Sequence, residues 1–286
     1  MRKLFQFLWR IIRAPFRLLT FPFHKVKEFI EQEPEDTPVP DVFAQTIQHP
    51  QMLLEHLEAM RKHLFRALGG MILTTAISVT FATHILDFLS EPIGGIEALR
   101  AIEVTESIGA FMRVSLLSGF ALAFPYILFE AFSFINPGLK KRERVIVLIA
   151  VPAAAALFLA GLAFAYFVML PAALPFMLNF MGIETVPRPS NYISFVTSLM
   201  FWIGIAFQFP LIIYAVAAMG FVRASTLIKG WRFAIIGIAI LAAMVTPTVD
   251  PVNMALVMAP MIFLYFVSIL LAAIATRARG KAPDGV

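Results

Sequence analysis

Two small clusters of charged side chains could bind a charged ligand. The first is a run of ionisable residues between two long apolar stretches: Lys140, Lys141, Arg142, Glu143 and Arg144. The second lies in "HLEAMRKHLF", where Glu58 precedes Arg61 and Lys62. Glu143 can soften the repulsion among its basic neighbours, and Glu58 is spaced for an i,i+4 pair with Lys62. The spacing alone therefore favours local charge pairing at both acids.

A different chemistry is possible at Gln208, which interrupts a long apolar stretch two residues before Pro210. An amide buried in hydrocarbon without partners is costly, and a proline frees a carbonyl one turn earlier in a helix. Gln208 and Pro210 therefore predict a polar site, formed by a helix–helix hydrogen bond or by a watery cavity. Glu130, in "ILFEAF", is a further candidate for a partner or intramembrane polar site, although an interfacial position would also explain it.

Motifs for catalysis are missing from the sequence. It contains no H-E-x-x-H, G-x-S-x-G or P-loop pattern, and the lack of cysteine excludes thiolate catalysis and zinc–thiolate sites. We therefore expect no enzymatic activity, no cofactor, no metal and no nucleic-acid partner. A small-solute membrane transporter remains an alternative, weakly supported because paired intramembrane carboxylates are missing and Gln208 is the one midplane polar candidate.

The elements that must position these residues are membrane-spanning helices. The chain is 60% hydrophobic and 14% charged, with a mean hydropathy of +0.84, whereas about a quarter of a soluble domain is charged. A span needs about 20 apolar residues. Six spans are predicted, and their approximate ranges are 67–85, 111–135, 145–170, 192–219, 233–245 and 253–275. The fifth is too short to cross a full bilayer core, and the connection after the third is predicted to run over 171–191.

Charge in the connections orients the predicted bundle. Basic residues collect in 140–144, 223–232 and 277–281, whereas 86–110 is mainly acidic. Because basic loops stay in the cytoplasm, both termini are predicted to be cytoplasmic, with Glu97, Glu184 and Asp250 outside. Hinges are predicted at Pro92, Pro125, Pro137 and Asp250.

Three parts of the chain are predicted. Residues 1–47 form a cytoplasmic extension, in which a basic amphipathic segment should bind anionic lipid and an acidic, Pro-rich linker follows. Residues 48–276 form the six-helix membrane domain, opened by a helix over 51–65 with an apolar stripe. Residues 277–286 form a basic cytoplasmic tail.

Several blocks together resemble the TatC family, the multi-spanning subunit of the twin-arginine protein translocase. "HLEAMRKHLF" is similar to that family's "HLEELRKRL" motif, and the block from "VTESIGAFMRV" to "FINPGLKKRERV" resembles its central signature. "FAYFVMLPAALPFM" and "TPTVDPVNMALVMAPM" resemble later blocks. The resemblance covers about residues 52–275 and leaves the N-terminal extension outside.

The resemblance implies an all-α, glove-shaped bundle of six helices in the bacterial inner membrane, with helices five and six short. It implies that twin-arginine signal peptides bind the cytoplasmic face and that folded proteins are exported by the proton-motive force. Glu143 matches the family's loop acid, and Glu58 matches the first acid of its N-terminal motif. Arg61 and Arg144 lie in the same two blocks and complete the implied signal-peptide site. TatA- and TatB-type single-span proteins, and further copies within a translocase complex, are the implied partners.

Three positions depart from the family pattern. Ala59 stands where the motif has its second acid, Gln208 replaces a glutamate within helix four, and Phe266 replaces a glutamate within helix six. Glutamine keeps hydrogen-bonding reach but cannot carry a charge. The sequence therefore leaves two interpretations open: a working but divergent TatC, or a paralogue with an assembly or anchoring role.

Overall fold

The computed structural model describes residues 50–135, 141–179, 185–218, 220–246 and 251–280. Within them, side chains are described except at 50–53, 141–149 and 278–280. The predicted extension 1–47, Glu184, Pro137, Asp250 and the last residues of the tail lie outside the described part. The described residues form helices and connecting turns and include no strand, so the predicted all-α class is confirmed.

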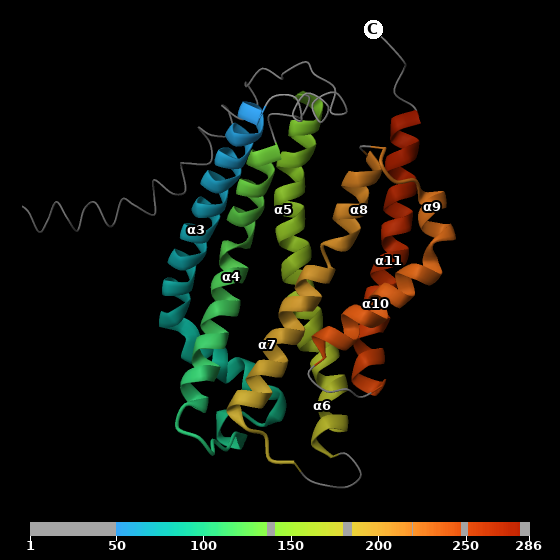
Figure 1. Ribbon diagram of the computed structural model, residues 1–286. Coiled ribbons are helices and arrows are strands. Elements are labelled where there is room, and N and C mark those ends of the chain that lie inside the picture. The colour runs from blue at the N-terminus through green and yellow to red at the C-terminus, as the bar shows by residue number, and fades with distance from the viewer. Residues whose placement is uncertain (1–49, 136–140, 180–184, 219, 247–250, 281–286) are drawn as a thin grey trace, which may run out of the picture. The chain divides into compact units, whose positions relative to one another are not determined.

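Most of the described chain is helix (Figure 1). The helices are α3 (Pro50–Ser90), α4 (Glu106–Ile135), α5 (Lys141–Phe164), α6 (Leu170–Leu178), α7 (Pro189–Ala206), α8 (Phe209–Ala218), α9 (Ala224–Lys229), α10 (Trp231–Val245) and α11 (Pro251–Gly280). Among the described residues, five apolar stretches are long enough to cross a membrane, and α10 is a shorter apolar helix. At 15 residues, α10 confirms the prediction of a short fifth helix, since it rises only about 22 Å.

Two predictions about helix length are wrong. The sixth helix is not short, because α11 has 30 residues and continues through Pro260 and past the apolar run. The third span does not end near residue 170. It passes from α5 through a π-helical segment, Ala165–Met169, into α6. Pro171 is the second residue of α6 and lies in its first turn, where a proline is tolerated because its missing N–H is not needed.

The helix predicted over 51–65 and the first span are one continuous helix. α3 has 41 residues, and no glycine or proline interrupts it before Gly69. Gly69 and Gly70 do not break it, because a glycine within a helix costs only about 1 kcal/mol relative to alanine. The charged motif and the first span therefore belong to the same helix.

The described chain divides into two compact units. Unit 1 contains the described residues of 50–68 and 126–151, and unit 2 contains the rest. α3, α4 and α5 pass from one unit to the other at Gly69, Pro125 and Pro152, which are all residues that weaken a helix. Pro125 thus lies at a boundary between units, and its role as a hinge stays a prediction.

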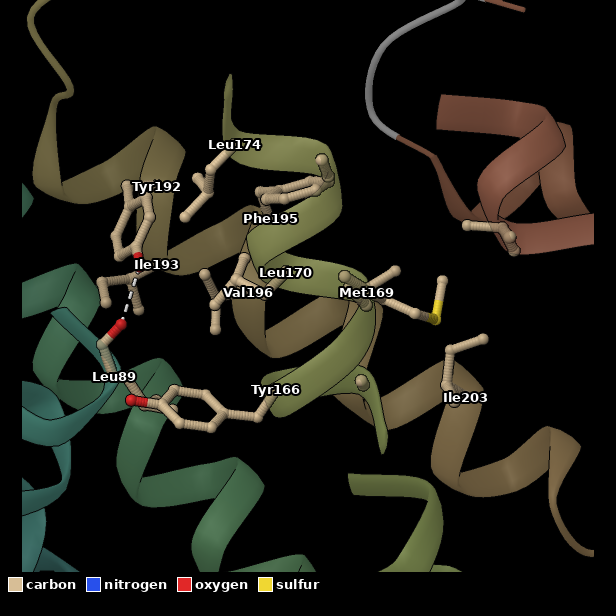
Figure 2. Close-up of a cluster of buried hydrophobic side chains, with 14 of the residues drawn as sticks. Leu89, Tyr166, Met169, Leu170, Leu174, Tyr192, Ile193, Phe195, Val196 and Ile203 are labelled. Atoms are coloured by element: carbon tan, nitrogen blue, oxygen red, sulfur yellow. Dashed lines mark hydrogen bonds between the residues drawn. The ribbon is translucent and has the colours of Figure 1, made fainter. Parts of the chain in front are cut away.

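The core of unit 2 gathers around α7 and the π-helical segment (Figure 2). Its fully buried side chains include Met169, Leu170, Ile193, Val196 and Ile203. Within the same unit, α11 packs against α8, α9 and α10, and Figure 1 shows α10 and α11 side by side.

Two tyrosines cap the end of α3 in this core. The Tyr192 hydroxyl donates to the Leu89 carbonyl at 2.7 Å, and the Tyr166 hydroxyl donates to the Phe88 carbonyl at 2.6 Å (Figure 2 shows the first bond). The last four carbonyls of a helix have no partner within the helix. The tyrosines satisfy two of them in an apolar environment and so fix where α3 stops.

Two glycines allow helices of unit 2 to approach closely. A Cβ atom on Gly161 of α5 would lie 2.8 Å from the Cα of Gly204 on α7. A Cβ atom on Gly119 of α4 would lie 2.6 Å from the Cα of Thr75 on α3. Small residues at such crossings allow the backbones of membrane helices to touch, so these two positions tie α5 to α7 and α4 to α3.

Candidate functional site

The first candidate residue, Glu58, is exposed on the charged part of α3 in unit 1. Its Oε1 lies 3.4 Å from the Lys62 Nζ and 3.7 Å from the Arg61 Nη2. The predicted i,i+4 pair with Lys62 is therefore confirmed. Its side chain is 55% exposed, so pairs of this kind contribute only about 0–1 kcal/mol and exchange partners easily.

A shallow polar cavity of about 340 Å³ opens beside Glu58. Its lining residues all come from α3 and are Glu55, Glu58, Ala59, Lys62, His63 and Arg66. Ala59, where the family motif has an acid, contributes a methyl group to this wall. The cavity therefore combines two carboxylates with several cationic or neutral nitrogen groups, a lining suited to a charged ligand rather than an apolar one.

The second pair of candidate residues, Glu143 and Arg144, lies in the first turn of α5. A carboxylate is favoured there by the partial positive charge of a helix N-terminus. The side chains of 141–149 are outside the described ones. A shared site of Glu143 with Glu58 therefore stays a prediction.

Glu130 is buried among protein side chains, and its depth in the membrane stays a prediction. Its side chain is 2% exposed, and its Oε2 lies 2.6 Å from the Nδ1 of His63 on α3. The His63 ring also meets Phe134 edge-on, and His56 packs against the same phenylalanine. A carboxylate can be buried here because α3 supplies a donor, which makes this contact a polar link between α3 and α4 in unit 1.

Sequence reasoning missed the Glu130 partner. His56 and His63 are seven residues apart on one helix, so they share a face, and Glu130 and Phe134 share a face of α4 in the same way. A histidine pair on one face of α3 and an acid with an aromatic residue on one face of α4 are the pattern from which this contact between the helices could have been predicted.

Gln208 makes the helix–helix hydrogen bond that was one of its two predicted roles. α7 ends at Ala206 and α8 begins at Phe209, so Gln208 lies in the turn between them. Its side chain is 7% exposed, and its Nε2 donates to the Ala154 carbonyl of α5 at 3.1 Å. Pro210 is buried in the first turn of α8, where its missing N–H is tolerated. Of the three residues predicted for the intramembrane polar site, Glu130 belongs to unit 1, whereas Gln208 and Pro210 belong to unit 2.

Phe266 occupies the third departing position, and its side chain is 54% exposed on α11. Its neighbour Tyr265 is buried and donates its hydroxyl proton to the Leu227 carbonyl of α9 at 2.7 Å. The aromatic pair thus has one member that fixes α9 to α11 and one that faces outward.

An ion pair that sequence reasoning also missed lies where α4 and α7 begin. Arg188, the residue before α7, donates from Nε to the Glu106 Oε1 at 3.0 Å and makes a second contact to it through Nη2. Its Nη2 also lies 3.4 Å from the Glu103 Oε1. The hydrogen bond to Glu106 raises the pKa of the Arg188 guanidinium, so it stays charged.

Known proteins match most of the described chain. The profile of the family Sec-independent protein translocase protein (TatC) matches residues 55–260. TatC of Carboxydothermus hydrogenoformans is 33% identical over 226 residues, which cover 78% of this chain and 93% of that protein. TatC of Synechocystis is 33% identical over 216 residues, which cover 75% of this chain and 85% of that protein.

The same likeness holds in three dimensions. A crystal structure of a protein named twin arginine translocase receptor, TatC, superposes with a TM-score of 0.69 at 29% identity. The superposition covers 78% of this chain and 100% of the chain in the crystal structure. The matches in sequence and in structure agree with the charged motif on α3 and with the series of apolar helices. The chain belongs to the TatC family of Sec-independent protein translocase proteins.

Proposed function

We propose that this chain is the receptor subunit of a twin-arginine translocase and binds twin-arginine signal peptides at Glu58 and Glu143. The observation that carries the proposal is the exposed Glu58 carboxylate, held only by weak pairs at the wall of a polar cavity. The receptor title of a similar solved structure supports it. Arg61 and Arg144, beside the two acids, would orient them toward the ligand.

The physical chemistry favours two acids acting together. A guanidinium binds a carboxylate through two parallel hydrogen bonds, which a lysine ammonium cannot reproduce. One such pair at a wet surface nets only about 0–1 kcal/mol. A ligand with two adjacent arginines therefore needs at least two carboxylates, and apolar contacts to the hydrophobic segment of the signal peptide would add to them.

The remaining partners follow from the same proposal. Single-span proteins of the TatA and TatB type would dock on the membrane helices, and further copies of this chain would join the complex. The basic extension 1–47 would bind anionic lipid at the cytoplasmic face of a bacterial inner membrane. A paralogue that anchors or assembles other subunits is the second candidate, favoured by Ala59, Gln208 and Phe266, where the family pattern has acids.

Neutralising the proposed acids should weaken peptide binding. We expect Glu143→Gln and Glu58→Gln each to lower the affinity for a twin-arginine peptide several-fold, because one charge-assisted pair at a partly wet surface contributes about 1 kcal/mol. Titration of the purified protein with labelled peptide measures this, and a twin-lysine peptide is the control. Glu97→Gln, at an exposed acid of the connection between α3 and α4, is the matched variant that should change nothing.

A substitution at Ala59 tests the same site by adding a carboxylate instead of removing one. Ala59→Glu adds a carboxylate to the same cavity wall and should tighten the binding of the twin-arginine peptide. Unchanged binding in the Glu143→Gln protein, with arginine still preferred to lysine, would remove Glu143 from the site. An unsubstituted protein that does not bind the twin-arginine peptide would favour the anchoring paralogue.

The proposed orientation is tested by labelling. Single cysteines at Glu97, Glu184 and Asp250 should react with a membrane-impermeant thiol reagent added to intact cells, because the basic connections hold the opposite face in the cytoplasm. A cysteine at Arg223 should react only after the cells are opened. Protection of all three outer positions in intact cells would contradict the topology.

A further inference from the structure

The Glu130 carboxylate is buried with only one of its oxygens in use. Oε2 receives the hydrogen bond from His63 at 2.6 Å. Oε1 is also buried, and no described donor lies within hydrogen-bonding distance of it. Tyr126, one turn earlier on α4, interacts with Glu130 through its hydroxyl as well as through charge, but it leaves Oε1 without a donor within hydrogen-bonding distance. A buried carboxylate oxygen without a donor is costly, so a second donor is needed there.

His63 connects this carboxylate to the cavity beside Glu58. Its side chain is 22% exposed. The ring contacts Glu130, and the same residue lines the 340 Å³ cavity together with Glu58 and Lys62. A ligand group that enters the cavity beside Glu58 can therefore contact the imidazole, and displacement of the ring would free the contact with Glu130.

The group that fits Glu130 better than His63 does is a guanidinium. An imidazole offers a carboxylate one N–H in this geometry, and an ammonium offers a point charge. A guanidinium offers two parallel N–H donors, spaced for both oxygens of one carboxylate. It would satisfy Oε1 as well as Oε2, and removal from water would strengthen both bonds.

We propose that Glu130 is a further guanidinium-binding residue of the signal-peptide surface, and that His63 occupies its place until a ligand arginine displaces the ring. The proposal rests on the proposed function, because it takes a twin-arginine peptide as the ligand. Glu58 would receive one arginine near the solvent, Glu130 would bind the other, and Glu143 would add a further carboxylate to the same surface. The negative charge that Ala59 does not supply on α3 would then come from α4.

Two other roles for Glu130 compete with this one. Arg66 lines the same cavity, so an internal guanidinium could pair with the carboxylate. The pair could also serve only to join α3 to α4, as the contacts of His56 and His63 with Phe134 do. The two roles predict different effects of substitution, because only ligand binding makes Glu130 important for the preference for arginine.

The test is a titration of the full-length protein with twin-arginine and twin-lysine peptides. We expect Glu130→Gln to weaken twin-arginine binding about tenfold, the loss of one charge-assisted pair in a water-excluded site, with little change for twin-lysine. The loss should persist at high salt, because a buried charge is poorly screened. Glu55→Gln removes one negative charge from the exposed wall of the cavity. It should lower the affinity for the twin-arginine peptide about twofold, and only at low salt.

Further variants separate the competing roles. His63→Gln keeps a neutral donor for Glu130 but removes the ring, and it should preserve or tighten twin-arginine binding. If the Glu130→Gln protein does not fold, Glu130→Asp is used in its place. Aspartate is one methylene shorter, so its carboxylate lies further from the ligand and should also lower the preference for arginine. If Arg66→Gln lowers the affinity for the twin-arginine peptide as much as Glu130→Gln does, the Glu130 carboxylate pairs with Arg66 rather than with the ligand. That result would overturn the proposal.

The results distinguish this proposal from the one on which it rests. A wild-type protein that does not bind the twin-arginine peptide, or binds it independently of Glu58 and Glu143, contradicts the receptor function itself. Binding that Glu58→Gln weakens and Glu130→Gln leaves intact contradicts only the role of Glu130. In that case the link between His63 and Glu130 is structural.

Discussion

Gly161→Val should leave little folded protein in the membrane. A Cβ atom at this position would lie 2.8 Å from the Gly204 Cα and 3.1 Å from the Ile203 carbonyl oxygen, both backbone atoms of α7. Backbone atoms cannot move aside as a flexible side chain can, so α5 and α7 must separate. Overpacking of this kind typically costs about 1–3 kcal/mol and can cost more. The separation would also weaken the buried aromatic packing between Phe158 and the same stretch of α7.

The measurement is the amount of monodisperse protein after detergent extraction, together with its thermal midpoint. Gly237→Val is the matched control, because it places the same side chain on an apolar helix where no atom lies within 4 Å of the new Cβ. Both substitutions replace glycine by a β-branched residue in a helix, so intrinsic helix propensity changes equally. Equal yields of the two variants would show that the contact between α5 and α7 does not limit the fold.

The sequence was sufficient to place most of the helices. Spanning helices are long apolar runs, and the runs near α4, α7, α10 and α11 are uninterrupted enough to be located from composition. The ends were less accurate for a local reason. Prolines ordinarily suggest the end of a helix, yet α6 follows a π-helical turn that brings Pro171 into a position where no N–H is required.

Polar partners were harder to predict than helices, because they depend on contacts between distant segments. His63 and Glu130 are 67 residues apart, and Arg188 and Glu106 are 82 residues apart. Each acid has basic residues nearer in the sequence, and nothing in the spacing selects the distant one. Gln208 was different. An amide within an apolar run must find a partner somewhere, so its buried bond could be predicted although Ala154 could not.

The largest electrostatic effect is expected from Arg188→Gln. The Glu106 side chain is only 3% exposed, and the Arg188 guanidinium provides two contacts to its Oε1. Its other oxygen, Oε2, is buried without a donor among the described residues. Without the guanidinium, a buried carboxylate would keep its charge without a cation, which is among the most destabilising changes a single substitution can make. We expect the thermal midpoint of the purified protein to fall by several degrees.

Two further variants identify the cause of that loss. Arg100→Gln is the matched control, since its exposed side chain neighbours the same connection and only its backbone N–H bonds to Pro187. It should be nearly neutral. Glu106→Gln added to Arg188→Gln removes the unpaired charge and should recover most of the lost stability, because the penalty comes from the isolated carboxylate rather than from the missing arginine. A double variant as unstable as Arg188→Gln alone would mean that the arginine acts through packing at the start of α7, and that the ion pair itself contributes little.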